Sequence, residues 1–438
     1  MLSKLMQPVW AVMEYGWYPA LALIATPYFM HTLGPEKYGH WMLLTATVGF
    51  GGILSAGTGA AVIKAVSAGF GRAKAEDVER AIRSSLVIAF VSGGVMTGFI
   101  LAVFLVAGET LFDKMGERSI VTLTGAGAAA LAWMEQIENV FVSALKGGER
   151  FGEAAIIEMV GKTIHIVAAL VAVIVWQSLV ALYSAIIFVA IVRLGAKAWA
   201  TKTFLGLSSL RPASVHIPDV IRFAGWGWLQ GAGGVFFSVA DRMLIGSVLG
   251  AASLAHYSIA TQLAQQIHGL AGAALSVVFP KLSRRLSEDK QFSLRRVTKL
   301  TIGANILAST VLALGLLVFG RSILSIWLGE KEAEASTELL WYLSVAYWLL
   351  AINVAPHFIL LGAGRMRFVA MSNFVAGAAS LASMLVLVQS YGVIGIATGR
   401  IFYGAIILIN CLVLVKHLWR EHAEGSPKTE ATSFVEAI

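Results

Sequence analysis

The sequence of 438 residues has few charged side chains and a single cysteine. Asp, Glu, Lys and Arg make up 13% of it, whereas 58% of it is hydrophobic. A soluble domain carries about 25% charged residues, so this composition excludes a soluble protein. Because Cys411 is alone, we expect neither a disulfide framework nor a thiolate metal cluster. The motif G-x-x-x-x-G-K-[ST] is also missing, which excludes a P-loop ATPase site.

Long apolar runs are what the sequence has instead. A helix crosses the hydrocarbon core of a bilayer with about 20 mainly apolar residues, and the mean hydropathy of this chain is +0.77. The runs are continuous and do not alternate, so transmembrane β-strands are excluded. We expect an all-α integral membrane protein with twelve transmembrane helices, at residues 9–33, 39–64, 84–108, 119–145, 153–176, 178–203, 221–248, 252–279, 300–328, 336–361, 367–389 and 392–417.

The two halves of the sequence resemble each other. Leu33-Gly34 and, 216 residues later, Leu249-Gly250 each begin a similar phrase, with a histidine six residues after the glycine. At this offset, nine of the 51 positions from Leu33 to Arg83 are identical. Internal similarity of this kind is typical of transporters built from two repeats. With six spans in each half, we expect parallel repeats that form two pseudo-symmetric six-helix lobes.

The repeat divides the chain into four parts. We expect an N-terminal six-helix lobe at residues 1–203 and a C-terminal six-helix lobe at residues 221–420. Residues 204–220 are more polar and include two prolines, which indicates an amphipathic linker on the cytoplasmic surface. Residues 421–438 form a polar cytoplasmic tail, which we expect to be disordered.

The net charge of +8 is concentrated in alternate loops. The basic loops include Arg80, Arg83, Lys146, Arg150 and Arg365. By the positive-inside rule, these loops and both termini lie in the cytoplasm. We interpret the charge as an orientation signal and a contact for anionic membrane lipid, and not as a nucleic-acid site.

Charged residues inside spans of the first half are candidate functional residues, because such charges face a watery cavity or a partner. Glu135 and Glu138 lie one turn apart in the fourth span, and Glu158 and Lys162 lie one turn apart in the fifth. Two interpretations stay open: a structural network in which Glu158 pairs with Lys162, or a cavity-lining site for an ion or a sugar. We expect Arg193 in the sixth span to extend to the cytoplasmic surface.

Charged and polar residues also interrupt the spans of the second half. Asp241 and Arg242 lie in the seventh span and Arg400 in the twelfth. Neighbouring residues on a helix point about 100° apart, so one of Asp241 and Arg242 faces Arg400 or the cavity while the other anchors packing. His268 and Gln265, one turn apart in the eighth span, are further candidates. We expect no catalytic residues, no metal site and no cofactor, since no zinc spacing or nucleophile–base pair is present.

Three short motifs resemble those of a known transporter family. They are Pro27–Trp41 (PYFMHTLGPEKYGHW), Asp241–Ala260 (DRMLIGSVLGAASLAHYSIA) and Leu361–Arg365 (LGAGR). The chain resembles the polysaccharide-transporter family (O-antigen or oligosaccharide flippases) of the multidrug/oligosaccharidyl-lipid/polysaccharide exporter superfamily. This resemblance implies two six-helix lobes arranged as a V around a central cavity, in a bacterial inner membrane.

The resemblance also implies a function. Flippases of this family move a polyprenyl-diphosphate-linked oligosaccharide from the cytoplasmic to the periplasmic leaflet by alternating access, driven by the membrane potential or an ion gradient. A polysaccharide polymerase and other assembly proteins are the implied partners. Cavity cations receive the diphosphate, which in this chain points to the Asp241-Arg242 pair. Arg400, His268 and Gln265 are added by their depth in the spans.

Two other functions stay open. A cation-coupled multidrug exporter of the same superfamily would need a carboxylate site, which Glu135 and Glu138 offer. An integral-membrane glycosyltransferase or ligase would act on the same lipid. Enzymes of that kind carry a large periplasmic loop with catalytic acids, whereas the loops of this chain on that side are short.

Overall fold

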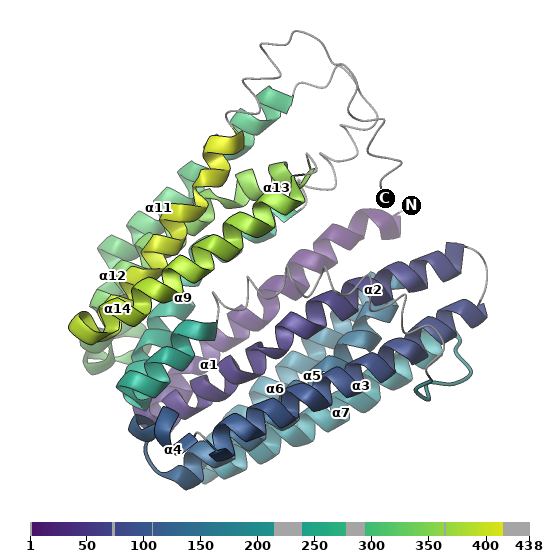
Figure 1. Ribbon diagram of the computed structural model, residues 1–438, viewed down its shortest axis with the longest axis horizontal. Coiled ribbons are helices and arrows are strands. Elements are labelled where there is room, and N and C mark those ends of the chain that lie inside the picture. The colour runs from purple at the N-terminus through teal and green to yellow at the C-terminus, as the bar shows by residue number, and fades with distance from the viewer. Residues whose placement is uncertain are drawn as a thin grey trace.

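The computed structural model describes residues 2–71, 75–106, 108–213, 239–276, 294–362 and 365–414. Every regular element in these ranges is a helix, which confirms the expected all-α class (Figure 1). Seven of the described helices are long and apolar enough to cross a membrane. The chain is therefore a multi-pass membrane protein.

Helices of the first half follow one another through short connections. Ser178 begins one of them by accepting a hydrogen bond from the Val180 amide, and Gly206, in the left-handed conformation, ends it. Each span expected in this half lies mainly on described helix. The elements are α1 (Leu2–Gly49), α2 (Gly51–Gly71), α3 (Ala75–Val106), α4 (Gly108–Leu111), the 3₁₀ helix η1 (Asp113–Met115), α5 (Arg118–Gly147), α6 (Phe151–Trp176) and α7 (Leu179–Leu205).

The second half is also helical wherever it is described. Of the span expected at 221–248, only the part from residue 239 is described, and residues 239–249 are helical. The tail expected at 421–438 lies outside the described residues. The remaining elements are α9 (Ala251–Ser276), α11 (Leu294–Leu328), α12 (Glu330–Ile352), α13 (Val354–Gly362) and α14 (Met366–Ile407).

Of the linker expected at 204–220, the structure describes only residues 204–213. α7 continues into it, and residues 206–213 are not helical. These residues pack back on α3, where Ser208 Oγ donates a hydrogen bond of 2.7 Å to Glu79. The start of the linker is thus attached to the helices of the first half, while residues 214–220 lie outside the described residues.

Residues with positive φ recur at matching places in the two halves. Gly34 interrupts α1 and Gly392 interrupts α14, so each of these long helices consists of two helices joined at a sharp turn. Three residues of the first half match three of the second at separations of 216, 213 and 215 residues: Gly34 with Gly250, Gly116 with Gly329, and Gln177 with Gly392. The backbone therefore repeats with nearly the offset found between the sequences.

The helices form two groups that meet at one end and diverge toward the end where α1 begins (Figure 1). α1 packs against α9 between the groups. The backbone of Ala251 lies so close to Gly39 that no Cβ would fit between them. Nearer the start of α1, before the turn at Gly34, the Leu23 carbonyl accepts a hydrogen bond of 2.9 Å from Trp327 Nε1 of α11. Backbone-to-backbone approach of this kind seals the end at which the groups meet.

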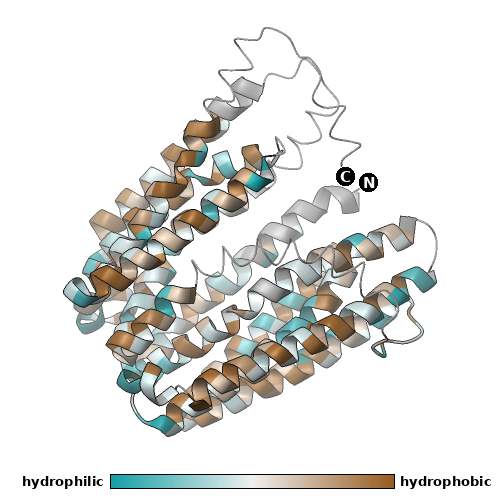
Figure 2. Ribbon diagram, viewed as in Figure 1, coloured by the Kyte–Doolittle hydropathy of each residue, from teal (hydrophilic) through white to brown (hydrophobic). Residues whose placement is uncertain are grey.

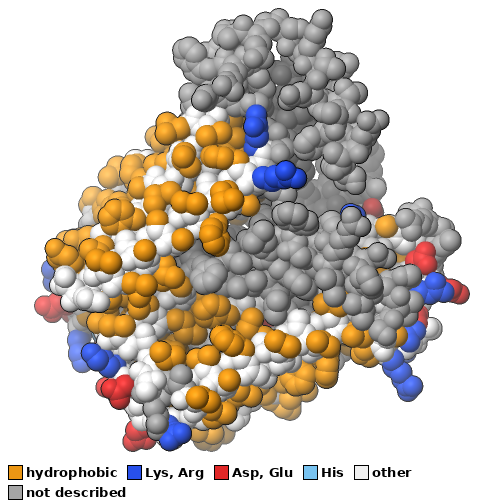
Figure 3. All heavy atoms as spheres, in the orientation of Figure 1, with side chains coloured by type: hydrophobic (Ala, Val, Ile, Leu, Met, Phe, Trp, Pro, Cys, Tyr) orange, Lys and Arg blue, Asp and Glu red, His pale blue; other side chains and the backbone are white. Residues whose placement is uncertain are grey.

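Hydrophobic residues predominate along the described helices (Figure 2). Hydrophobic side chains occupy the sides of the visible face, and the described acids and bases gather near its two ends (Figure 3). Val95, Phe99, Val106 and Ile326 are among the large apolar residues that are exposed. In water this surface would be unfavourable, whereas in a bilayer it faces hydrocarbon.

Candidate functional site

A cavity of about 650 Å³ lies between the two groups of helices. α1, α2, α5, α6 and α7 form most of its wall, and residues 239–249 and α9 form the opposite side. Although the helices are apolar outside, this wall is rich in charge. The charged residues that line it are Glu14, Glu135, Glu138, Lys146, Glu158, Lys162, Arg193, Lys197 and Arg242.

Glu138 is the centre of an ion network in the first half. One of its carboxylate oxygens lies 2.6 Å from Lys197 Nζ and 2.6 Å from Arg193 Nη2. The side chains of Glu138 and Lys197 are each 3% exposed, and Lys197 also pairs with Glu158. The network joins α5, α6 and α7. The expectation that Arg193 extends to the cytoplasmic surface was wrong, because the carboxylate of Glu138 holds it inside the protein.

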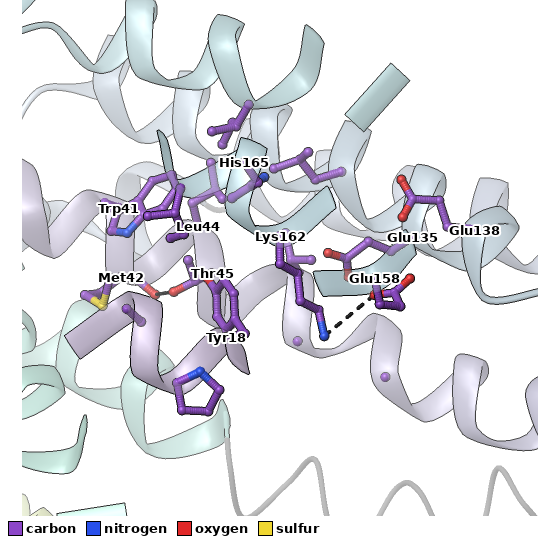
Figure 4. A pocket seen from close by; sticks show the side chains of 18 of the residues that line it. Tyr18, Trp41, Met42, Leu44, Thr45, Glu135, Glu138, Glu158, Lys162 and His165 are labelled. Carbon is purple, nitrogen blue, oxygen red and sulfur yellow. Dashed lines mark hydrogen bonds and ion pairs between the residues drawn. The ribbon is translucent and has the colours of Figure 1, made fainter. Parts of the chain in front are cut away.

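Glu158 and Lys162 are both paired with each other and placed on the cavity wall. Their charged atoms are 3.6 Å apart, as the i, i+4 spacing indicates (Figure 4). His165 continues the same stripe of α6, and its ring lies 6.3 Å from that of Trp41. The Nδ1 atom of His165 is buried and has no hydrogen-bond partner among the described residues. The two interpretations of this stripe therefore do not exclude each other.

Glu135 differs from the other carboxylates of the wall. It lies near Glu138 and Glu158 (Figure 4) and is exposed to the cavity. Within the described part of the chain, no hydrogen bond or ion pair engages its carboxylate, whereas Glu14 is paired with Lys146 at 2.8 Å. Glu135 is thus an acid on the cavity wall that no described residue pairs with, beside a compensated network.

Arg242 is the corresponding exception among the cations. It lines the cavity from the second half of the chain, and its backbone amide donates to its neighbour Asp241. In the described ranges, no carboxylate lies within ion-pair distance of its guanidinium, and its Nε atom is buried without a partner. A buried donor without a partner is costly, so this guanidinium is ready to bind an anion that enters the cavity.

Asp241 faces away from the cavity and pairs with Arg400. Arg400 Nη2 lies 2.6 Å from Asp241, and the two side chains are 1% and 0% exposed. Tyr257 Oη donates to Asp241 at 2.5 Å, and Tyr347 hydrogen-bonds to Arg400. Arg400 is therefore placed in a buried structural network and is not among the cavity-lining residues. Because neighbouring side chains on a helix point about 100° apart, Asp241 packs inside the protein while Arg242 faces the cavity.

Of the two other candidate residues in the second half, one lines the cavity and one does not. Gln265 lines the cavity, whereas His268, one turn further along α9, is not among the lining residues. Reasoning from the sequence did not single out Lys197 in the sixth span, nor Ser258 and Gln262 on α9. A stripe of polar residues at i, i+4 and i+7 on an apolar helix was the available signal for the α9 residues. Among the described residues, no three His, Cys, Asp or Glu side chains are grouped to hold a metal ion.

The fold and the cavity together define the class of this protein: a multi-pass membrane protein with the fold of the multidrug/oligosaccharidyl-lipid/polysaccharide (MOP) exporter superfamily. An inward-facing multidrug resistance MATE family transporter of that superfamily superposes with a TM-score of 0.73 at 15% identity, over 97% of this chain and 99% of its own. Lipid II flippase MurJ, in an inward closed conformation, superposes with a TM-score of 0.76 at 11% identity, over 93% and 87%. The chain belongs to the family described as polysaccharide biosynthesis protein, whose model matches residues 10–286.

Two relatives match most of the chain. A putative O-antigen transporter of Shigella flexneri is 22% identical over 416 residues, which cover 94% of this chain and 97% of the relative. A probable low-salt glycan biosynthesis flippase of Haloferax volcanii is 22% identical over 381 residues, covering 86% and 76%. The family membership confirms the resemblance that the sequence motifs indicate.

Proposed function

We propose that this protein is a flippase that moves a polyprenyl-diphosphate-linked oligosaccharide from the cytoplasmic to the periplasmic leaflet of a bacterial inner membrane, for the synthesis of a surface polysaccharide. Its family and the names of two relatives, an O-antigen transporter and a glycan flippase, support this function. In this proposal the protein is a transporter and not an enzyme, and its partners are the lipid-linked glycan, membrane lipid and the polymerase and assembly proteins that follow it.

The proposed architecture is twelve transmembrane helices in two six-helix lobes, at residues 1–203 and 221–420. The matching positive-φ residues of the two halves support it. The sharp turns at Gly34 and Gly392 also support it, because each divides one long helix into two segments that run back and forth. The lobes meet at the end that carries Gly34 and Gly250, and the cavity opens toward the opposite end.

The proposed orientation puts the open end and both termini in the cytoplasm. Fusions of alkaline phosphatase, which is active only outside the cytoplasm, test this topology. A fusion after Gly148, between α5 and α6, should be inactive, and a fusion after Gly329, between α11 and α12, should be active. Fusions of a cytoplasmic reporter at the same two positions are the control and should give the reverse pattern. Activity of the phosphatase at Gly148 would contradict the orientation.

A single observation carries the assignment of the substrate: the guanidinium of Arg242 lines the cavity and pairs with no described carboxylate. The other lining cations are already compensated, since Lys146, Lys162, Arg193 and Lys197 each contact a carboxylate. A diphosphate carries about two negative charges, and charge-assisted hydrogen bonds from arginine are its strongest protein contacts. We assign Arg242 to the diphosphate, with Gln265 on the same side of the cavity.

The energetics of this transport are favourable without a coupled ion. An inside-negative potential of about 100 mV drives two negative charges outward and releases roughly 4–5 kcal/mol. Hydroxyl groups left without partners in hydrocarbon cost several kcal/mol each, which a polar cavity avoids. The membrane potential is therefore a sufficient driving force, and an ion gradient is an additional one.

Replacing Arg242 tests the proposal. In proteoliposomes that contain a fluorescent prenyl-diphosphate oligosaccharide, Arg242→Ala should slow flipping by about 30-fold, since a hydrogen bond to a charged group contributes about 2 kcal/mol. Arg242→Lys should retain part of the rate because it keeps the charge. Arg367→Ala is the matched control, because this exposed arginine lies outside the cavity wall. Normal flipping by Arg242→Ala at normal protein abundance would contradict the assignment.

The carboxylate of Glu135, which no described residue engages, favours a second candidate function, a cation-coupled multidrug exporter. Such a protein would use this acid for a proton or a sodium ion and would tolerate the loss of Arg242. Efflux of a cationic dye that is lost in Glu135→Gln and retained in Arg242→Ala would support the exporter over the flippase.

A further inference from the structure

One face of α9 presents only uncharged hydrogen-bonding groups to the cavity. Ser258, Gln262 and Gln265 line the cavity at i, i+4 and i+7 of this helix. With a rise of about 1.5 Å per residue they extend over about 10 Å of the wall. The facing wall of the first half carries the charged network instead. The two sides of the cavity therefore differ in the ligand chemistry that they offer.

Hydrogen-bonding capacity on this face is largely unused. The Oγ atom of Ser258 is buried, the residue is 2% exposed, and the hydroxyl has no partner among the described residues. Thr26 Oγ1 donates to Gln262 Oε1 at 2.9 Å, which leaves the amide nitrogen of Gln262 available. No described side chain or backbone group bonds to the amide of Gln265. Buried polar groups normally have partners, so these groups are suited to bind a ligand that donates and accepts hydrogen bonds.

The face begins at the level of Arg242. Asp241, which precedes Arg242, accepts a hydrogen bond from Tyr257, which precedes Ser258. Ser258 and Arg242 both line the cavity near this level, and Gln262 and Gln265 follow Ser258 at one and two turns of α9. Across the cavity, the buried Nδ1 of His165 also has no partner in the part of the chain that the structure describes. A group that follows an anion bound at Arg242 would meet these neutral donors and acceptors next.

We propose that Ser258, Gln262 and Gln265 form a subsite for the uncharged sugar that is attached to the diphosphate. This inference rests on the proposed function and specifies part of its substrate. Hydroxyl and acetamido groups match serine and glutamine, which both donate and accept hydrogen bonds. A sugar carboxylate would find no cation on this face, and the cations opposite are engaged in ion pairs. The subsite thus selects a neutral hexose or N-acetylhexosamine over a uronic acid.

Binding to the purified full-length protein in nanodiscs tests the subsite. The ligands are a short-chain prenyl diphosphate, the same prenyl diphosphate carrying N-acetylglucosamine, the same carrying glucuronic acid, and free N-acetylglucosamine. The N-acetylglucosamine conjugate should bind about 20-fold more tightly than the bare prenyl diphosphate, from two or three neutral hydrogen bonds. The glucuronic acid conjugate should show no such gain. Free N-acetylglucosamine should not bind at millimolar concentration, because the diphosphate supplies most of the affinity.

Variants of α9 separate the sugar contacts from the anion contact. Gln262→Ala and Gln265→Ala should each weaken the N-acetylglucosamine conjugate by about fivefold and leave the bare prenyl diphosphate unchanged. Gln266→Ala is the matched control, because the Gln266 amide bonds to the backbone of its own helix and does not line the cavity. Arg242→Gln should weaken both prenyl diphosphates equally.

The outcomes distinguish failure of the subsite from failure of the proposed function. Equal affinity of the wild type for the bare, the N-acetylglucosamine and the glucuronic acid ligands overturns the subsite without any variant. Sugar-dependent binding that survives both glutamine substitutions overturns it as well. If the wild type does not bind prenyl diphosphates, or if Arg242→Gln does not weaken that binding, the flippase proposal is overturned. Tight binding of free N-acetylglucosamine would identify a sugar transporter and overturn both.

Discussion

Arg400→Ala is expected to deplete the protein from the membrane and not merely to slow transport. Arg400 is 1% exposed and contacts Asp241 through two nitrogen atoms, at 2.6 and 2.8 Å. Removing one partner of a buried pair leaves an uncompensated charge that costs about 3–5 kcal/mol, which is a large fraction of the total stability of a protein. Immunoblotting of membranes and the thermal midpoint of the detergent-solubilised protein measure this loss.

Removing both charges provides the control for the Arg400 prediction. In Asp241→Leu combined with Arg400→Met, no unpaired charge stays behind, so abundance should recover to near the wild-type level. The double variant should also transport, since neither residue lines the cavity. Wild-type abundance and thermal midpoint in Arg400→Ala would show that the pair contributes nothing to stability.

Glu138→Ala, in the first half of the chain, is expected to cause a loss of stability of similar size. Its carboxylate contacts Lys197 Nζ and Arg193 Nη2, both at 2.6 Å, and its loss leaves two cations to share the acid of α6. We expect a destabilisation of about 3–5 kcal/mol and a clear drop in the thermal midpoint. Glu138→Gln should be intermediate, because the amide oxygen still accepts a hydrogen bond but carries no charge.

Glu135→Ala is the matched control for Glu138, one turn away on the same helix. Both acids line the cavity, but Glu135 is exposed there and no described residue pairs with it. Loss of the Glu135 side chain should change the thermal midpoint little. Removing this like charge from beside Glu138 can even stabilise the network. Equal destabilisation by the two substitutions would mean that pairing is not what distinguishes these acids.

Much of the fold followed from apolar run length. The expected spans at 119–145, 153–176 and 178–203 correspond closely to α5, α6 and α7, because hydrophobic length in a bilayer defines a helix almost directly. Interruptions were harder to predict. The break at Phe50 between α1 and α2 falls inside the expected span at 39–64 and has no proline to mark it.

The site was predictable where its contacts are local. The pairing of Glu158 with Lys162 follows from their spacing on one helix, and the separation of Asp241 from Arg242 follows from the helical angle. The contacts of Glu138 with α7 span 55 and 59 residues, and no periodicity in the sequence specifies which helices become neighbours. Arg400 was assigned to the cavity by depth alone, and depth does not say which way a side chain faces.

The buried pair of the second half has a consequence for biosynthesis. Asp241 and Arg400 are 159 residues apart, so at the usual rate of synthesis roughly 10–30 s pass between the two. During that time the nascent chain holds an acid in the bilayer without its cation, at a cost of about 2.5–3.5 kcal/mol on the insertion scale. The acids of the first half, Glu138 and Glu158, are joined by their cations within 59 residues or fewer. Stability of the second half therefore depends on arrival of the final span, and a chain that stops short of Arg400 retains a polar defect by which membrane proteases can recognise it as incomplete.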